Sequence, residues 1–214
     1  MNNVEIAKVA KELNKRFSNT VIPPTNLDWG KPSLNILDCV LSLNRRYYEF
    51  AYPRIQTFES NNPDCILIED LINVIQKYKG NFGEFTIKEL DYNHAERGKI
   101  IFEVAQYLLK EIAKINEGNQ IEKLEIWAKN AKPEEAFNLE IKGFGLAGFQ
   151  YLRMLMGAQT AKPDVHIKKY LSDIVGRNLS DIDALNLLTE AALKIGLSLR
   201  DLDGEIWNIQ SGSY

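Results

Sequence analysis

The chain has 214 residues, an apolar fraction of 45% and a formal net charge of −3 at pH 7. This length supports one compact unit or two closely packed helical lobes, and the apolar content argues against wholesale disorder. No apolar run reaches the roughly 20 residues that span a bilayer, and the charged N-terminal segment lacks the apolar core of a signal peptide. We therefore expect a cytoplasmic protein with no membrane partner. The negative charge also argues against indiscriminate nucleic-acid binding.

The chain contains two cysteines, Cys39 and Cys65, and two histidines, His94 and His166. They form no Cys/His cluster in the sequence, so a zinc site held by side chains is not expected. Two isolated cysteines are typical of buried thiols in a reducing compartment.

Helical periodicity dominates the N-terminal half. Apolar positions predict a first amphipathic helix that ends near Phe17, followed by a connector rich in proline over residues 18–33. Ser33 is the expected cap of a buried helix that follows it. Another helix is expected from about Leu67 to Tyr78, and the glycine- and aromatic-rich turn over residues 80–85 precedes an unassigned segment.

In the second half, Asn93 with Glu96 three residues later predicts the start of the longest helix, over residues 95–115. Shorter helices are expected near residues 120–130 and 133–139. Ser180 and Ser198, each followed by an aspartate three residues later, predict the starts of two further helices. No run alternates as a strand does, so the sequence predicts an all-α protein.

A Gly-x-Gly turn, Gly143 to Gly145, lies between two segments with a helical pattern, residues 138–142 and residues 146–157. Glycine permits positive φ and close backbone approach, and the helix after Gly145 would offer free N–H groups to a phosphate. The alternative is a tight turn between helices in which glycine serves geometry alone. Between Ile141 and Asn178, basic residues outnumber acidic ones by four, which permits a basic face on an acidic protein.

Asp164 stands 19 residues beyond Gly145, at the expected start of another helix. Aspartate is a preferred helix cap, which by itself would explain this residue. A carboxylate at this position could also stabilise positive charge on a sugar, and one residue can perform both roles because it has two oxygens.

These segments together resemble the helix-hairpin-helix DNA glycosylase superfamily, typified by endonuclease III and 8-oxoguanine glycosylase. The residues that carry the resemblance are Leu139, Ile141, Gly143, Gly145, Ala147 and Gly148 in the hairpin, Pro163, Asp164, Val165 and His166 after it, and Leu41, Ser42, Leu43 and Asn44 before it. The resemblance covers roughly residues 31–207. It implies that Asp164 is catalytic and that Asn44 belongs to a loop that probes duplex DNA.

Three departures from the family pattern bear on function. Lys142 replaces the usual proline before the first hairpin glycine. Ala147 stands where bifunctional members carry a nucleophilic lysine, so Schiff-base lyase chemistry through this residue is excluded. The four-cysteine iron–sulfur loop of endonuclease III is absent. The resemblance therefore implies a monofunctional branch without an iron–sulfur cluster, with a monovalent cation (K⁺ or Na⁺) at the hairpin backbone.

The resemblance also implies a two-lobed architecture. One lobe would be a helical barrel over residues 32–158 that contains the hairpin, about residues 133–157. The other would combine residues 1–31 with residues 159–214. The expected partner is double-stranded DNA, contacted by Asn44, Arg45, Lys142, Gly143, Gly145 and Ala147, and the expected state is a nucleoid-associated monomer.

The expected function is hydrolytic removal of a damaged, mismatched or modified base, as in base-excision DNA repair, with Asp164 as the catalytic residue. One alternative is a DNA-structure-binding protein that has lost catalysis and uses Asp164 only as a cap. Another is a helical protein-interaction domain without a role on DNA. Arginines and tyrosines between Arg45 and Arg54 could contact phosphates and bases, or form a solvated face beside core tyrosines.

Overall fold

The computed structural model describes residues 2–17 and 28–211. Within these ranges the protein is all-α and has no strand. The α-helices are α1 (Asn3–Phe17), α2 (Pro32–Leu41), α3 (Tyr52–Asn61), α4 (Ile68–Gln76), α5 (Phe82–Leu90), α6 (Ala95–Ile112), α7 (Gln120–Asn130), α8 (Leu146–Leu155), α9 (Val165–Val175), α10 (Asp181–Ile195) and α11 (Leu199–Ser211). A π-helix, η1 (Tyr47–Ala51), leads into α3, and a 3₁₀ helix, η2 (Pro133–Asn138), precedes the hairpin.

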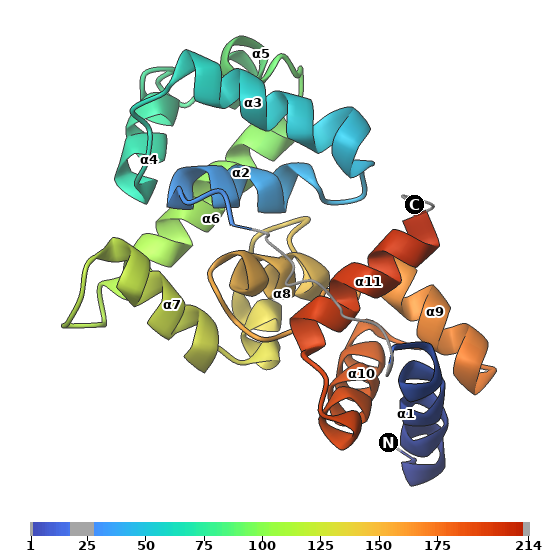
Figure 1. Cartoon of the computed structure of the whole chain (residues 1–214). Helices are drawn as coiled ribbons and strands as arrows, with labels where there is room; N and C mark the ends of the chain where they lie inside the picture. Colours follow the sequence, from blue (N-terminus) through green and yellow to red (C-terminus); the bar gives the residue numbers. More distant parts are fainter. Residues whose placement is uncertain (1, 18–27, 212–214) are drawn as a thin grey trace.

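Helices α2 to α8 enclose one core of buried hydrophobic side chains, which runs in sequence from Leu34 to Ala158. Helix α2 lies at its centre, since every residue of this helix is buried. A helix that is buried on all sides needs neighbours on all sides, and α3, α4, α6 and α8 supply them. In Figure 1 helices α2 to α7 form the upper and left parts of the molecule, and α8 lies near its centre.

A second core is built from both ends of the chain. It joins α1 to α9, α10 and α11, and its buried members run from Val9 to Phe17 and from Ala161 to Ile206. Helix α1 packs along α10 at the lower right of Figure 1, with the N-terminus beside them. The strap over residues 156–164 crosses from the end of α8 in the first core to α9 in the second.

Several boundaries agree with the sequence predictions. Helix α1 ends at Phe17, and Ser180 caps α10 by accepting a hydrogen bond from Asp183 N. The predicted cap at Ser33 is wrong, because its hydroxyl donates to Cys65 O instead. The predicted cap at Asn93 is also wrong, since His94 Nδ1 accepts from Arg97 N at the start of α6. The prolines of the predicted connector at positions 23 and 24 lie outside the described residues.

The hairpin differs from two full α-helices joined by a turn. Its first element, η2, is a 3₁₀ helix of six residues, where a short helix near residues 133–139 was predicted. Its second element is α8, which begins at Leu146 directly after the Gly143–Gly145 turn. None of the described helices is long and apolar enough to cross a membrane.

Candidate functional site

The hairpin turn has the backbone geometry that its glycines predict. Gly143 adopts a φ of +85°, which side chains rarely tolerate, and Phe144 N donates to Ile141 O at 3.0 Å to close the turn. Phe144 is buried, whereas Lys142, Gly143 and Gly145 are exposed. Gly145 is the N-cap of α8 and supplies no side-chain cap, so the first N–H groups of α8 are not taken by it.

The loop over residues 42–46 lies against this hairpin. A Cβ atom at Gly148 would come within 2.9 Å of Phe144 and 3.1 Å of Leu43, so the glycine allows both side chains to pack on the start of α8. Leu43 directly precedes Asn44 and Arg45, which are exposed. The structure therefore brings two separate groups of predicted DNA contacts, the loop and the hairpin, next to each other.

The conformation of this loop is held from α6. Asn44 has a φ of +55°, in the left-handed region that non-glycine residues seldom adopt. Arg97 Nη1 donates to Val40 O and Arg97 Nη2 to Leu43 O, each at 2.6 Å, so one guanidinium caps the end of α2. Burial lowers the pKa of Arg97 from its ordinary value. Asn44 is thus presented to solvent on a fixed backbone.

Asp164 is the N-cap of α9 and remains partly exposed. Its Oδ1 accepts hydrogen bonds from His166 N at 2.9 Å and from Ile167 N at 3.2 Å. The capping role that the sequence predicts is therefore confirmed. The bonds fall on one oxygen, which leaves Oδ2 outside the cap.

A second carboxyl group, Asp203 of α11, lies within electrostatic reach of Asp164. It is 8% exposed, and its Oδ1 accepts a hydrogen bond from Lys162 N at 2.7 Å. Burial first, and the negative charge of Asp164 second, raise the pKa of Asp203 to about 8, against the opposing effects of that hydrogen bond and the Lys162 ammonium. At neutral pH this carboxyl group therefore keeps its proton while it stands close to the Asp164 carboxylate.

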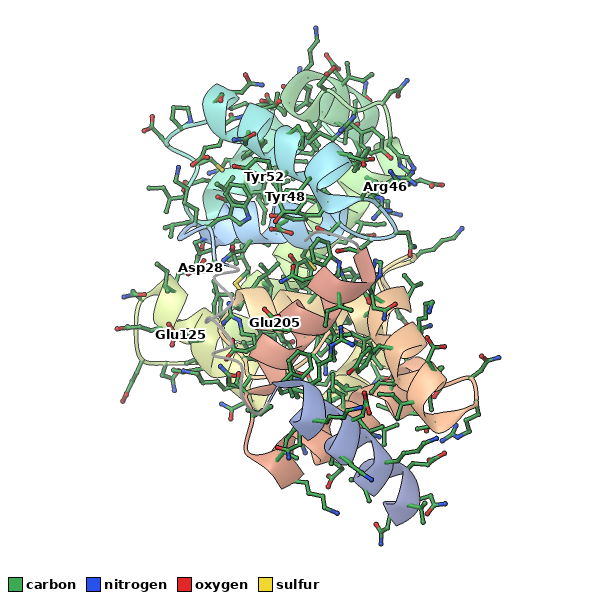
Figure 2. The ribbon with its side chains drawn as sticks, turned by 45° about the vertical axis from the view of Figure 1, so that its right-hand side comes forward. Asp28, Arg46, Tyr48, Tyr52, Glu125 and Glu205 are labelled. Carbon is green, nitrogen blue, oxygen red and sulfur yellow. The ribbon has the colours of Figure 1, made fainter. Side chains whose placement is uncertain are left out.

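Aromatic side chains join the two cores near these acids. Trp207, one turn beyond Asp203 on α11, contacts His166 at a ring-centroid distance of 6.2 Å and Tyr48 of η1 at 6.3 Å. Tyr48 also lies 6.3 Å from Tyr52, and Figure 2 shows these two tyrosines side by side above α11, which carries Glu205. Tyr48 is 64% exposed. These rings thus connect η1 with α9 and α11 where the two groups of helices meet.

In the first core, the buried side chain of Asp38 binds several polar side chains, among them that of Tyr47, whose ring contacts Tyr48. Asp38 in α2 is 1% exposed and accepts four side-chain hydrogen bonds. The donors are Trp29 Nε1 at 2.7 Å and, each at 2.9 Å, the hydroxyls of Tyr47, Ser42 and Tyr151. Burial, followed by the charge of Asp38, raises the pKa of Tyr47 and Tyr151, so both hydroxyls remain donors.

Sequence reasoning missed Asp38, Lys162, Asp203 and Trp207 as parts of one site. Asp38 had a visible signal, since it is a lone acid within the apolar run of α2. Asp203 and Trp207 had a weaker one, the four-residue spacing that puts two side chains on one face of a helix. Nothing in the sequence indicates that this face meets the strap.

Among the described residues, neither a cluster of metal ligands nor a cavity is found at Asp164. Within residues 2–17 and 28–211, no group of three or more His, Cys, Asp or Glu side chains could hold a metal ion. A small cavity of about 80 Å³ has Asn35, Glu125 and Arg200 in its lining and does not include Asp164.

The fold and these residues define an all-α protein with two cores, in which an acid-capped helix and an aromatic wall meet at the junction. The chain belongs to the family described as a domain of unknown function (DUF8548), whose profile matches residues 7–211. No curated protein and no solved structure matches it.

Proposed function

We propose that the protein is a monofunctional DNA glycosylase with a two-lobed helix-hairpin-helix architecture. It would hydrolyse the N-glycosidic bond of a damaged, mismatched or modified base in duplex DNA, acting as a monomer in the cytoplasm on the nucleoid. The observation that carries the proposal is the partly exposed carboxylate of Asp164 at the start of α9, the helix whose His166 contacts Trp207, which in turn contacts Tyr48 of η1. This combination of negative charge and flat surfaces suits a nucleoside turned out of a duplex.

In the proposed reaction, the bond between C1′ and the base nitrogen breaks and the base departs with the electron pair. Positive charge then develops on the deoxyribose, and the Asp164 carboxylate stabilises it. Water then adds to C1′ and transfers a proton to Asp164, which we propose as the general base. The capped geometry helps because the carboxylate is already oriented by two N–H groups before substrate arrives.

DNA would be gripped by the hairpin and the loop over residues 42–46. Lys142 and the N–H groups at the start of α8, which have no side-chain cap, suit a phosphate, while Asn44 and Arg45 are exposed on the adjoining loop. We also propose a monovalent cation at main-chain carbonyls of the hairpin, as the resemblance implies. Such an ion would supply positive charge toward a phosphate.

Asp164→Asn provides the test, because asparagine is also a good helix cap and should preserve α9 while it removes the charge. We would incubate the protein with duplexes carrying a panel of base lesions and mismatches, then cleave abasic sites with alkali. We expect strand scission with at least one substrate, and a loss of about 100-fold or more in Asp164→Asn. Asp173→Asn, on the exposed side of α9, is the matched control.

A second candidate is a protein that binds distorted DNA without chemistry. It is favoured by the cap, since two hydrogen bonds to one oxygen already give Asp164 a structural role. Salt-sensitive binding to bulged or gapped duplexes, with no alkali-labile product on any substrate, would establish this candidate over the glycosylase.

A further inference from the structure

Phe50, in the π-helix η1, lies at the centre of a group of arginine and aromatic side chains. The guanidinium carbon of Arg54 lies 4.0 Å from the centre of the Phe50 ring, and that of Arg45 lies 5.3 Å from it. The Tyr92 ring meets the Phe50 ring edge-on at 4.8 Å. Arg97, which caps the end of α2, is close enough to Arg45 for their charges to interact. We call these three arginines and two rings the arginine cluster.

Among the described residues, no carboxylate is paired with the arginine cluster. Its three arginines take part in none of the ion pairs that these residues form, whereas the neighbouring Arg46 pairs with Glu49. Burial lowers the pKa of Arg97, and the positive charge of Arg45 lowers it further, since a like charge disfavours the ionised form. The chain as a whole carries a net charge of −3. Unpaired positive charge is thus concentrated at one place, where a bound anion would relieve the repulsion.

Within the arginine cluster, Arg97 has a structural role, and the other two arginines have donors left. Two Arg97 nitrogens donate to backbone carbonyls at the end of α2. Arg54 Nη1 donates to Phe50 O at 2.9 Å, and Arg54 Nε has no acceptor among the described residues. The exposed Arg45 donates to the Asn44 carbonyl oxygen at 3.5 Å. Because a guanidinium has five N–H donors, Arg45 and Arg54 can bind an anion without breaking these contacts.

The loop over residues 42–46 joins the arginine cluster to the hairpin. Leu43 packs against the start of α8, whereas Arg45, two residues later, lies over the Phe50 ring. Asn44 stands between them in the chain, exposed and in a left-handed backbone conformation. One short loop thus contacts both elements, so a duplex that reaches Asn44 can touch the hairpin and the arginine cluster together.

We propose that Arg45 and Arg54 of the arginine cluster bind backbone phosphates of duplex DNA, as a second anchor beside the hairpin. This inference rests on the proposed function only in that DNA must be the ligand, and it requires no base to be removed. It decides between the two roles that the sequence leaves open for Arg54, a phosphate contact and a solvated side chain. Arg97 then holds the loop in place without touching the DNA.

A nucleic-acid backbone fits this arrangement better than a single small anion does. A planar guanidinium can bind a phosphate through two parallel hydrogen bonds. Duplex DNA carries about one negative charge per 1.7 Å of its axis, so it presents phosphates to both anchors at once. Contacts of this kind position a duplex and do not read its sequence. Two anchors would therefore fix the backbone around the point that Asn44 reaches.

The test measures binding of the full chain to an undamaged duplex by fluorescence anisotropy, between about 50 mM and about 200 mM salt. Arg45→Gln and Arg54→Gln should each bind more weakly than the wild type. In each, the slope of log affinity against log salt concentration should become shallower by about 0.9, because one fewer phosphate is neutralised. Arg46→Gln is the matched control, since it removes the same charge from a side chain that is already paired with Glu49, and its slope should equal that of the wild type.

Arg54→Lys separates charge from folding, because an ammonium keeps the positive charge beside Phe50. It should retain most of the slope that Arg54→Gln loses, and thermal unfolding should show that each variant is folded. If Arg54→Gln unfolds, the exposed Arg45 decides the result through Arg45→Gln.

No salt-sensitive binding by the wild type, unchanged slopes in the folded glutamine variants, or an equal change in Arg46→Gln would each overturn the proposal. Cleavage of lesion duplexes is scored separately. A protein that excises no base can still show these slopes, and an active glycosylase can fail this test.

Discussion

Asp203 shows how strongly one buried residue depends on its surroundings. It has a single hydrogen-bond donor among the described contacts, Lys162 N, and it shares the junction with another acid. An ionised carboxylate would have lost its water without full compensation, so the neutral form is favoured. The free energy of unfolding should therefore depend on pH through this residue.

Because the pKa of Asp203 is raised to about 8 in the folded protein, from an ordinary value of 3.8, unfolding releases a proton between these limits. Its contribution to stability is complete below pH 3.8 and is lost as the pH rises toward 8. In this window the free energy of unfolding should fall by about 1.4 kcal/mol per pH unit from this group.

Urea titrations of the wild type and Asp203→Asn from pH 5 to pH 9 would measure this effect. Asparagine keeps an acceptor for Lys162 N and carries no proton to lose, so the wild type should show the steeper decline below pH 8. Identical pH dependence in the two proteins would show that the Asp203 carboxyl group is ionised in the fold.

Gly148 is the residue on which the loop and the hairpin meet. Gly148→Ala should lower the free energy of unfolding by about 1–3 kcal/mol, because its methyl group would collide with Phe144 and Leu43. Gly145→Ala is the control, since a Cβ atom at Gly145 has no neighbour within 4 Å. Chemical denaturation would compare them, and an equal loss in both variants would contradict the tight packing at Gly148.

At the scale of elements, the end of α2 determines where the loop over residues 42–46 can lie. Two carbonyl groups at this end accept from Arg97, and Asp38 one turn earlier binds the Ser42 hydroxyl and Tyr47 of η1. These contacts hold the exposed Asn44 in its left-handed backbone conformation. A loop that is restrained before DNA arrives loses less conformational entropy on binding.

Arg97→Ala should therefore destabilise the protein by about 2 kcal/mol and free the end of α2, because two charge-assisted hydrogen bonds are lost. Hydrogen–deuterium exchange should accelerate at the amides of residues 43–46 more than in α10. Lys99→Ala, which removes an exposed ion pair with Glu103 on the same helix, should change neither quantity by much. Unchanged exchange in Arg97→Ala would argue against the restraint.

Helix boundaries were predictable where local chemistry determines them. The cap at Ser180 and the amphipathic pattern that ends at Phe17 are local, and the structure agrees with both. Helix α5 was missed because its sequence begins with the glycine- and aromatic-rich turn, although Asn81 accepts from Glu84 N as an ordinary cap. At α6, His94 replaced the expected Asn93 because an imidazole nitrogen can also accept from a backbone N–H.

The candidate site was predictable only in part for a related reason. Gly143 and the cap at Asp164 follow from short-range backbone rules, and both appear as predicted. Contacts such as Trp207 with Tyr48, or Tyr151 with Asp38, join residues more than 100 positions apart. Helical periodicity indicates which face of each helix is buried, but it carries no information about which distant element covers that face.

At the scale of the whole molecule, an aromatic contact spans the junction between the two cores. Tyr48 and Trp207 meet across it, and the exposure of Tyr48 leaves this contact easy to open. If a nucleobase entered here, Tyr48 or Trp207 would exchange its contact with the other ring for a contact with the base. Such an exchange costs little, because each ring can stack on the incoming base instead.

Tyr48→Ala should therefore weaken binding of a lesion duplex or abasic duplex by roughly 10-fold or more, with little effect on folding, since stacking is worth about 1–3 kcal/mol. Tyr48→Phe keeps the ring and should bind normally. Fluorescence anisotropy would give the dissociation constants, and thermal unfolding would confirm the fold. Equal affinity of Tyr48→Ala and the wild type would remove Tyr48 from the DNA-binding surface.

The pairing of α1 with α10 has a consequence for biosynthesis. Helix α1 leaves the ribosome before the helices of the first core, yet it belongs to a core whose other helices come after them. Residues 34–158 can complete their own core while α1 waits with its apolar stripe uncovered. Folding during translation should therefore start in the middle of the chain, and the waiting helix is the segment that a chaperone would need to shield.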